Sequence, residues 1–187
     1  LNFQQSIIDL TGMDIANASL LDEATATAEA VGLSQRLDKT NSKKIFISNN
    51  CNPQTIDLIK TRTNPFGLEL IIGDEKKELT KINDDIICGV LSYPGTLGEI
   101  NDPSESISLI HKKNGKAILV CDLLALARLK TPAELGADIA VGSAQRFGIP
   151  MGYGGPHAAF FATKEEFKRS MPGRIIGVSK DRHGKKA

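Results

Sequence analysis

AILVCDLLAL, residues 117–126, contains the strand that decides the fold. Four consecutive apolar residues, Ala117–Val120, lead to an acidic residue, Asp122. A short continuous apolar run predicts a strand that is buried on both faces, which is typical of parallel sheets covered by helices. The run IICGVLSY at Ile86–Tyr93 has the same character, and Ser104–Lys113 between the two runs is expected to be a helix. We therefore predict two parallel strands joined by a helical crossover.

Further strands and helices are expected on both sides of this pair. Proline is favoured at the first position of a helix, and glycine readily forms the left-handed cap at a helix end. Ser19 is expected to cap an alanine-rich helix. The expected helices are Asn2–Thr11 ending at Gly12, Ser19–Ala30, Gln54–Thr61 opened by Pro53, and a short helical turn at Thr131–Gly136. The expected strands are Lys44–Ser48, Leu68–Ile72, Asp138–Val141 and Ala158–Ala162, with a strand-like Arg174–Val178.

The alternation of strands and helices predicts an α/β fold with three layers, in which helices cover both faces of a mostly parallel sheet. A chain of 187 residues is long enough for one such core. The sequence begins at Leu1 inside a helical pattern and has no initiator methionine, and it ends in the basic segment Ser179–Ala187. We therefore expect residues 1–187 to form a single partial domain of a longer protein.

The overall charge points away from polyanionic partners. There are 23 basic and 22 acidic residues, so the formal net charge is only +1, and neither nucleic acid nor a membrane surface is indicated as a partner. No apolar run approaches the length of a membrane span. Cys51, Cys88 and Cys121 lack the spacing of metal ligands, so no metal site is predicted, and free cysteines favour a reducing compartment.

Two segments are candidate ligand sites. The hydroxyl-rich start of the Ser19–Ala30 helix, with Ser19 and Thr25, could present backbone N–H groups to a phosphate, although such a helix can equally be structural. Asp122 lies at the end of a strand, where open α/β sheets place ligand-binding residues. It is a candidate charge partner for a cation such as a protonated pyridine nitrogen, and the alternative role is a helix cap.

A third candidate is the loop Gly142–His157, which reads GSAQRFGIPMGYGGPH. Its glycines indicate positive φ angles or close backbone approaches, and its polar residues are Gln145, Arg146, Tyr153 and His157. Arg146 could clamp an anion, or the loop could be a rigid connection with Arg146 on the surface. The loop does not match a phosphate-loop fingerprint, which disfavours a stand-alone nucleotide-binding protein.

The sequence offers no catalytic nucleophile of its own. No serine–histidine or cysteine–histidine pair can be assembled, and only His157 among the histidines is a candidate general base. The lysines gather in polar runs and are expected to be solvated, and none is placed like a Schiff-base lysine.

The sequence resembles the P-protein of the glycine cleavage system over essentially the whole chain, and four stretches carry the resemblance. They are LTGMDIANASLLDEATATAEA at Leu10–Ala30, SYPGTLGEI at Ser92–Ile100, CDLLAL at Cys121–Leu126, and the long run from Gly136 to Asp181 that contains SAQRFGIPMGYGGPHAAFFA.

The resemblance implies a glycine dehydrogenase (decarboxylating), a pyridoxal-phosphate enzyme with the aspartate-aminotransferase-like fold known as fold type I. Such enzymes are built from two related halves or two subunits. They decarboxylate glycine and pass its aminomethyl group to the lipoyl arm of the H-protein. The chain is expected to be part of the large-domain core of this fold.

This sequence resembles the N-terminal half, or the corresponding subunit, which lacks the cofactor-bearing lysine. Gln145 or Arg146 falls where the catalytic half has that lysine, and neither can form a Schiff base. Asp122 matches the aspartate that pairs with the pyridine nitrogen, and the turn before Ser19 matches the phosphate cradle. The resemblance therefore implies degenerate counterparts of a cofactor site at Ser19, Thr25, Asp122, Gln145 and Arg146, with pyridoxal phosphate held by the other half and no catalytic residue in this chain.

Further expectations concern partners. Tyr153 and His157 are expected to face the lysine-bearing half. A departure from the family pattern lies at Asn52, which precedes Pro53 where relatives usually have histidine. The fragment is expected to be inactive by itself and to form dimers, in a bacterial cytoplasm rather than a mitochondrial matrix. The alternative is a purely structural module that stabilises its lysine-bearing partner.

Overall fold

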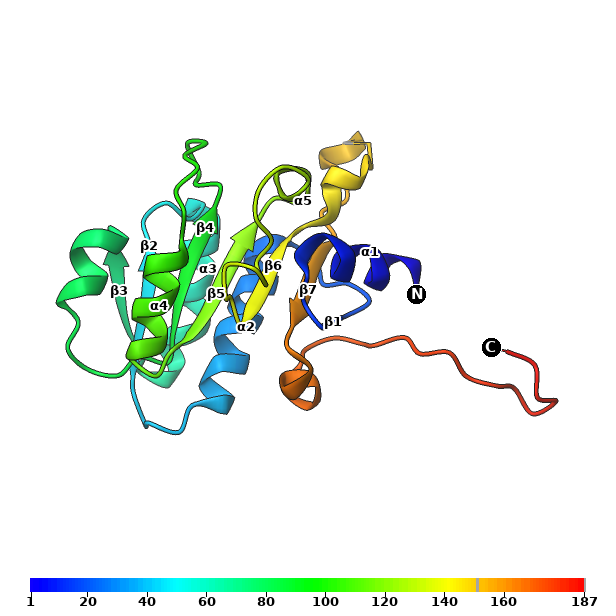
Figure 1. The fold of residues 1–187 in the computed structure, drawn as a ribbon, viewed down its shortest axis with the longest axis horizontal. Helices are drawn as coiled ribbons and strands as arrows, with labels where there is room; N and C mark the ends of the chain where they lie inside the picture. Colours follow the sequence, from blue (N-terminus) through cyan, green and yellow to red (C-terminus); the bar gives the residue numbers. More distant parts are fainter. Residues whose placement is uncertain (151, 187) are drawn as a thin grey trace.

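The computed structural model describes residues 1–150 and 152–186. At its centre lies one seven-stranded sheet with the strand order β1-β7-β6-β5-β4-β2-β3 (Figure 1). The strands are β1 (Ile15–Ala16), β2 (Lys44–Ser48), β3 (Glu69–Gly73), β4 (Cys88–Tyr93), β5 (Lys116–Cys121), β6 (Ile139–Ser143) and β7 (Ala159–Thr163).

The sheet is mostly parallel, as predicted. Strands β3, β2, β4, β5 and β6 run in one direction, whereas β7 and β1 are antiparallel to their neighbours. The carboxyl ends of the five parallel strands therefore meet at one edge of the sheet. Ligand sites of open α/β sheets lie at this edge.

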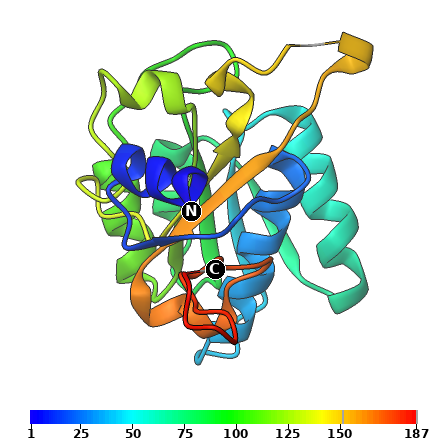
Figure 2. The same cartoon turned by 90° about the vertical axis from the view of Figure 1, so that its right-hand side faces the viewer.

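Helices cover both faces of the sheet (Figures 1 and 2). Helices α2 (Glu23–Leu37) and α3 (Pro53–Thr63) pack against one face, and α1 (Asn2–Thr11), α4 (Ser104–Lys112) and α5 (Leu123–Leu126) pack against the other. Single helical turns complete the chain: η1 (Asn64–Phe66), η2 (Glu75–Leu79), η3 (Ala144–Phe147), η4 (Gly152–Gly154) and η5 (Glu165–Ser170). The predicted three-layer architecture is confirmed.

The alternation of side chains along β5 divides the core into two layers. Ile118 and Val120 join the cluster under α2 and α3, and Leu119 joins the cluster on the opposite face. All three are at most 5% exposed. A strand buried on both faces must be apolar at every position, which explains the uninterrupted run of the sequence.

The backbones of β5 and β6 approach each other closely at Gly142. A Cβ atom built there would lie 2.1 Å from the carbonyl oxygen of Cys121 and 2.7 Å from the ring of Phe160. Glycine is the only residue that fits without moving the strand ends, and these ends carry the site described below.

The start of the second helix was predicted incorrectly. It begins at Glu23 rather than at Ser19, because Asp22 accepts a hydrogen bond from the N–H of Thr25 at 2.8 Å and forms the cap. Leu20 instead forms a β-bridge with Ala159, which keeps the preceding residues extended.

Three further differences concern short segments. Thr131–Gly136 forms turns rather than a helix, and the side chain of Glu134 folds back to accept the N–H of Thr131 at 2.7 Å. Arg174–Val178 is extended but belongs to no strand, because Ile176 bonds to the side chain of Gln4 instead of a neighbouring strand. The two-residue strand β1 was not predicted.

Candidate functional site

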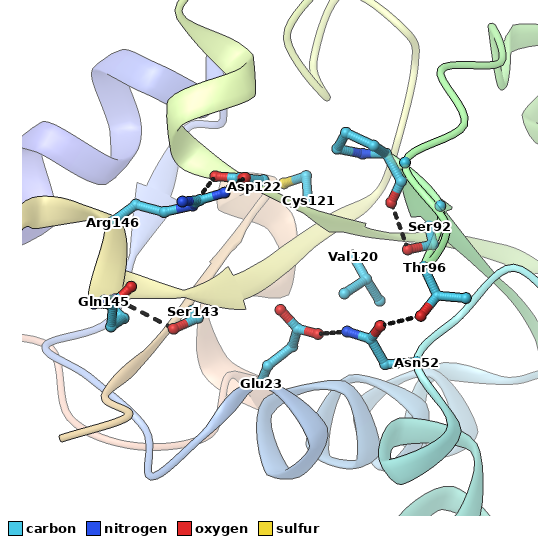
Figure 3. A pocket seen from close by; sticks show the side chains of 13 residues that line it. Glu23, Asn52, Ser92, Thr96, Val120, Cys121, Asp122, Ser143, Gln145 and Arg146 are labelled. Atoms are coloured by element: carbon cyan, nitrogen blue, oxygen red, sulfur yellow. Dashed lines mark hydrogen bonds and ion pairs between the residues drawn. The ribbon is translucent and has the colours of Figure 1, made fainter. Parts of the chain in front are cut away.

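A pocket of ≈ 380 Å³ opens at the carboxyl edge of the sheet (Figure 3). Its walls come from the ends of β4, β5 and β6, the first turn of α2, and the residue before α3. The lining residues are Glu23, Asn52, Ser92, Pro94, Gly95, Thr96, Gly98, Val120, Cys121, Asp122, Ser143, Gln145 and Arg146. The topology brings these five segments together because parallel strands all present their carboxyl ends to the same edge.

One side of the pocket holds an ion pair between Asp122 and Arg146. The Nε of Arg146 lies 3.1 and 3.0 Å from the two carboxylate oxygens of Asp122, and its Nη2 lies 2.8 Å from Oδ2. The hydrogen bonds from the guanidinium to Asp122 raise the pKa of Arg146. Asp122 also accepts the N–H of Leu124 at 2.9 Å, so it caps α5 as well. The cap that the sequence left open for Asp122 is therefore present, whereas its role as charge partner of a ligand cation stays a prediction.

The opposite side holds a chain of three polar side chains. The hydroxyl of Thr96 donates to Oδ1 of Asn52 at 2.6 Å, and Nδ2 of Asn52 donates to Oε1 of Glu23 at 2.9 Å. Burial raises the pKa of Glu23, although the hydrogen bond from Asn52 and the backbone of Ser143 oppose this shift. These hydrogen bonds fix the orientation of the Glu23 carboxyl within the pocket (Figure 3).

The loop after β4 closes the pocket on this side. The hydroxyl of Ser92 donates to the carbonyl of Pro94 at 2.8 Å, and the N–H of Thr96 donates to the carbonyl of Asn50 at 2.8 Å. The second bond ties the loop to the residues that follow β2. Thr96 is therefore held by both its backbone and its hydroxyl.

The structure brings together some of the predicted site residues. Asp122, Gln145 and Arg146 line the pocket. Ser19 is exposed and does not line it, and the N–H and hydroxyl of Thr25 both bond to Asp22, which is the helix cap rather than a ligand site.

The proposed partner-facing residues lie elsewhere. Tyr153 and His157 are exposed in the loop between β6 and β7, outside the pocket lining. A partner-facing role for them stays a prediction.

The sequence interpretation missed Glu23, Ser92 and Thr96 as pocket residues. Glu23 lies in the predicted helix Ser19–Ala30 and was not among the predicted site residues. Asn52 was noticed as a departure from the usual histidine, and its bonds to Glu23 and Thr96 now give that substitution a structural context.

A second polar cluster lies at the opposite edge of the sheet, around Asp138. Burial disfavours ionisation of this carboxyl, but hydrogen bonds from His111, Lys164 and the N–H of Ala117 outweigh it and lower its pKa to about 2. The cluster connects α4, β5, β6 and the residue after β7. Its role is therefore to hold elements together at the edge away from the pocket.

Among residues 1–150 and 152–186, no group of acidic, histidine and cysteine side chains is arranged to hold a metal ion. Within the same ranges, no helix combines the length and apolar character needed to cross a membrane.

Comparisons with known proteins place this geometry in a family. The model of the glycine cleavage system P-protein family matches residues 1–187. The chain is 77% identical over its whole length to the glycine dehydrogenase (decarboxylating) of Pelagibacter ubique (strain HTCC1062) and 54% identical to that of Stutzerimonas stutzeri (strain A1501). It spans 19% of the length of each of these relatives.

Solved structures agree with the sequence comparison. The chain superimposes on a glycine decarboxylase (P-protein) of the glycine cleavage system with a TM-score of 0.88 and 34% identity, over 98% of this chain and 42% of that one. A cystathionine gamma synthase from Xanthomonas oryzae pv. oryzae, 14% identical, gives a TM-score of 0.71 over 89% of this chain and 42% of that one, and supports the fold alone. The fold is thus the predicted aspartate-aminotransferase-like α/β fold, and the chain belongs to the glycine cleavage system P-protein family.

Proposed function

We propose that this chain is part of the N-terminal, non-lysine half of a glycine dehydrogenase (decarboxylating), and that residues 1–187 are one partial domain of that half. In the full assembly, pyridoxal phosphate would supply the electron sink for decarboxylation of glycine, and the aminomethyl group would pass to the lipoyl arm of the H-protein. Family membership supports this assignment. The bacterial origin of similar relatives favours a cytoplasmic location. The reaction would belong to the assembly and not to this chain alone.

The pocket lining carries the proposal, because these residues do not fit pyridoxal phosphate. Among the described residues, no lysine lines the pocket. The carboxylate of Asp122, which would face a pyridine nitrogen, is already paired with Arg146. The start of α2 carries Asp22 as its cap and Glu23 beside it, and two carboxylates repel a phosphate at a helix end that would otherwise attract one.

Exposed apolar side chains around the pocket support a partner at this edge. Four exposed apolar residues lie one or two positions in sequence from a pocket-lining residue. They are Leu21, Leu97, Leu124 and Phe147. We call these four residues the apolar rim. An apolar rim around a polar pocket is typical of a surface that packs against another protein, and we propose that the lysine-bearing half covers it.

The proposal is tested by adding pyridoxal phosphate to the purified chain, recording the visible absorption of a lysine-bound cofactor, and mapping any borohydride-reduced lysine by peptide mass spectrometry. We expect no stable absorption band and no stoichiometrically labelled lysine. A lysine-bearing P-protein treated in parallel is the positive control. Stoichiometric label on a single lysine of this chain would contradict the proposal. Absence of label together with failure to support a lysine-bearing half in glycine decarboxylation would favour the purely structural module.

A further inference from the structure

Two of the hydroxyl groups that line the pocket, those of Ser92 and Thr96, present acceptors to its interior. Ser92 donates its hydroxyl hydrogen to the carbonyl of Pro94 at 2.8 Å, and Thr96 donates its hydrogen to Oδ1 of Asn52 at 2.6 Å. A hydroxyl group has one hydrogen to donate and two lone pairs that accept. Because both hydrogens are committed, any ligand of this pocket meets the lone pairs of Ser92 and Thr96.

Glu23 adds a charged acceptor that has no cation beside it. Its Oε1 accepts from Asn52 at 2.9 Å, and its carboxyl projects into the pocket (Figure 3). Glu23 forms no ion pair with any residue in the described part of the chain. Burial raises its pKa, which means that the carboxylate is poorly solvated where it lies. A cation that enters the pocket would relieve this cost.

The other charged residues of the lining compensate each other. Asp122 is paired with Arg146 by three contacts of 2.8–3.1 Å, so Glu23 is left as the uncompensated charge of the pocket. Divalent cations usually require several carboxylate or carbonyl ligands, and here a guanidinium lies in the same lining. A primary ammonium group has three N–H donors, one positive charge and no acceptor, which matches one carboxylate and two hydroxyl acceptors.

We propose that this pocket binds the primary ammonium group of a small amine, with Glu23 as its counter-ion and with Ser92 and Thr96 as additional acceptors. Asn52 is the positioning residue, because it holds the Glu23 carboxyl and is itself oriented by Thr96. The ligand is either a simple alkylamine or an amino acid whose carboxylate contacts Nη1 of Arg146, which has no hydrogen-bond partner among residues 1–150 and 152–186. This inference does not depend on the location of pyridoxal phosphate or on the identity of the partner half.

The test is a titration of the ¹⁵N-labelled chain with methylammonium chloride, followed by two-dimensional NMR. We expect saturable shifts confined to the pocket residues, and at least a tenfold weaker affinity in Glu23→Gln. Tetramethylammonium chloride at equal concentration has the charge but no N–H donors, so it should cause no saturable shift. Glycine in place of methylammonium separates the two ligand classes, because tighter binding of glycine would assign the amino acid and weaker binding would assign the alkylamine.

Matched variants separate a pocket effect from general charge. Glu29→Gln removes a carboxylate from the same helix, where Glu29 pairs with Arg62 outside the pocket, and should leave the affinity unchanged. Thr96→Val keeps Glu23 but removes an acceptor, and should weaken binding severalfold, so the proposal remains testable if Glu23→Gln does not fold. Equal losses in Glu23→Gln and Glu29→Gln, equal shifts with tetramethylammonium, or no saturable shift with either methylammonium or glycine would each overturn the proposal.

Discussion

Replacing Asp138 with asparagine should destabilise the fold at neutral pH and remove much of its acid sensitivity. The Asp138 side chain is 5% exposed and bonds to His111, Lys164 and the N–H of Ala117. Asparagine keeps a similar shape and one oxygen acceptor but loses the charge. Because the change is nearly isosteric, its effect reports mainly on the charge of this cluster.

The magnitude follows from the pKa of Asp138. Lowering it from the ordinary value of 3.8 to about 2 corresponds to about 2 kcal/mol of stabilisation of the folded state. The folded-state pKa lies below the unfolded one, so this stabilisation is present above pH 4 and is lost as the pH falls toward 2. Asp138→Asn should therefore lower the free energy of unfolding at pH 7 by about 2 kcal/mol.

The assay is urea denaturation followed by circular dichroism, at pH 7 and at several pH values between 5 and 2. Between pH 5 and pH 2, the free energy of unfolding of the wild-type chain should fall by about 2 kcal/mol more than that of Asp138→Asn. Asp57→Asn is the matched control, because Asp57 pairs with Lys60 on the surface and should change stability by less than about 0.5 kcal/mol. An Asp138→Asn variant as stable as wild type, or with the same acid dependence, would show that the charge of Asp138 does not stabilise the fold.

Three further predictions concern packing, capping and thiol reactivity. Gly142→Ala should lower the melting temperature strongly and cost about 3 kcal/mol or more, because its Cβ would overlap the carbonyl of Cys121, whereas Gly177→Ala, which meets no atom within 4 Å, should be nearly neutral in the same melting experiment. Asp22→Ala should cost about 1 kcal/mol in thermal unfolding by loss of the α2 cap, and an unchanged melting temperature would argue against that cap. Burial raises the pKa of Cys51 and Cys88 to about 12, so a disulfide reagent at pH 8 should label neither thiol until denaturant is added, and rapid labelling of the folded chain would contradict their burial.

Much of the fold could be predicted because most of its strands are buried on both faces. The apolar runs at β4 and β5 and the glycine cap at Gly12 are local signals, and local signals suffice to place such elements. The strand β1 has only two residues, Ile15 and Ala16, which is too short for a periodicity to be visible. The antiparallel direction of β7 depends on the path of the connection between β6 and β7. No residue of β7 itself encodes a direction.

The site was predicted only in part for a similar reason. Asp122 could be found because its place at the end of a strand is a local property of the sequence. Its pairing with Arg146 and the contact of Glu23 with Asn52 join residues that are 24 and 29 positions apart. These contacts depend on the order of the strands in the sheet, and the sequence contains no local signal for that order.

The start of α2 shows how a local signal can mislead. Ser19 and Asp22 are both good capping residues, and three positions separate them. The β-bridge of Leu20 with Ala159, a tertiary contact, decides in favour of Asp22.

Site-specific photo-crosslinking tests whether the carboxyl edge of this chain packs against a lysine-bearing half. A photoreactive amino acid replaces Leu97, which belongs to the apolar rim and is 86% exposed. In the control it replaces Phe66, an apolar residue of η1 that is 64% exposed and lies outside the rim. After mixing with the lysine-bearing half of a P-protein, the reagent at Leu97 should form a crosslink to that half, and the reagent at Phe66 should not. Crosslinks from Phe66 with none from Leu97, or no crosslink from either position, would show that this edge does not pack against the lysine-bearing half.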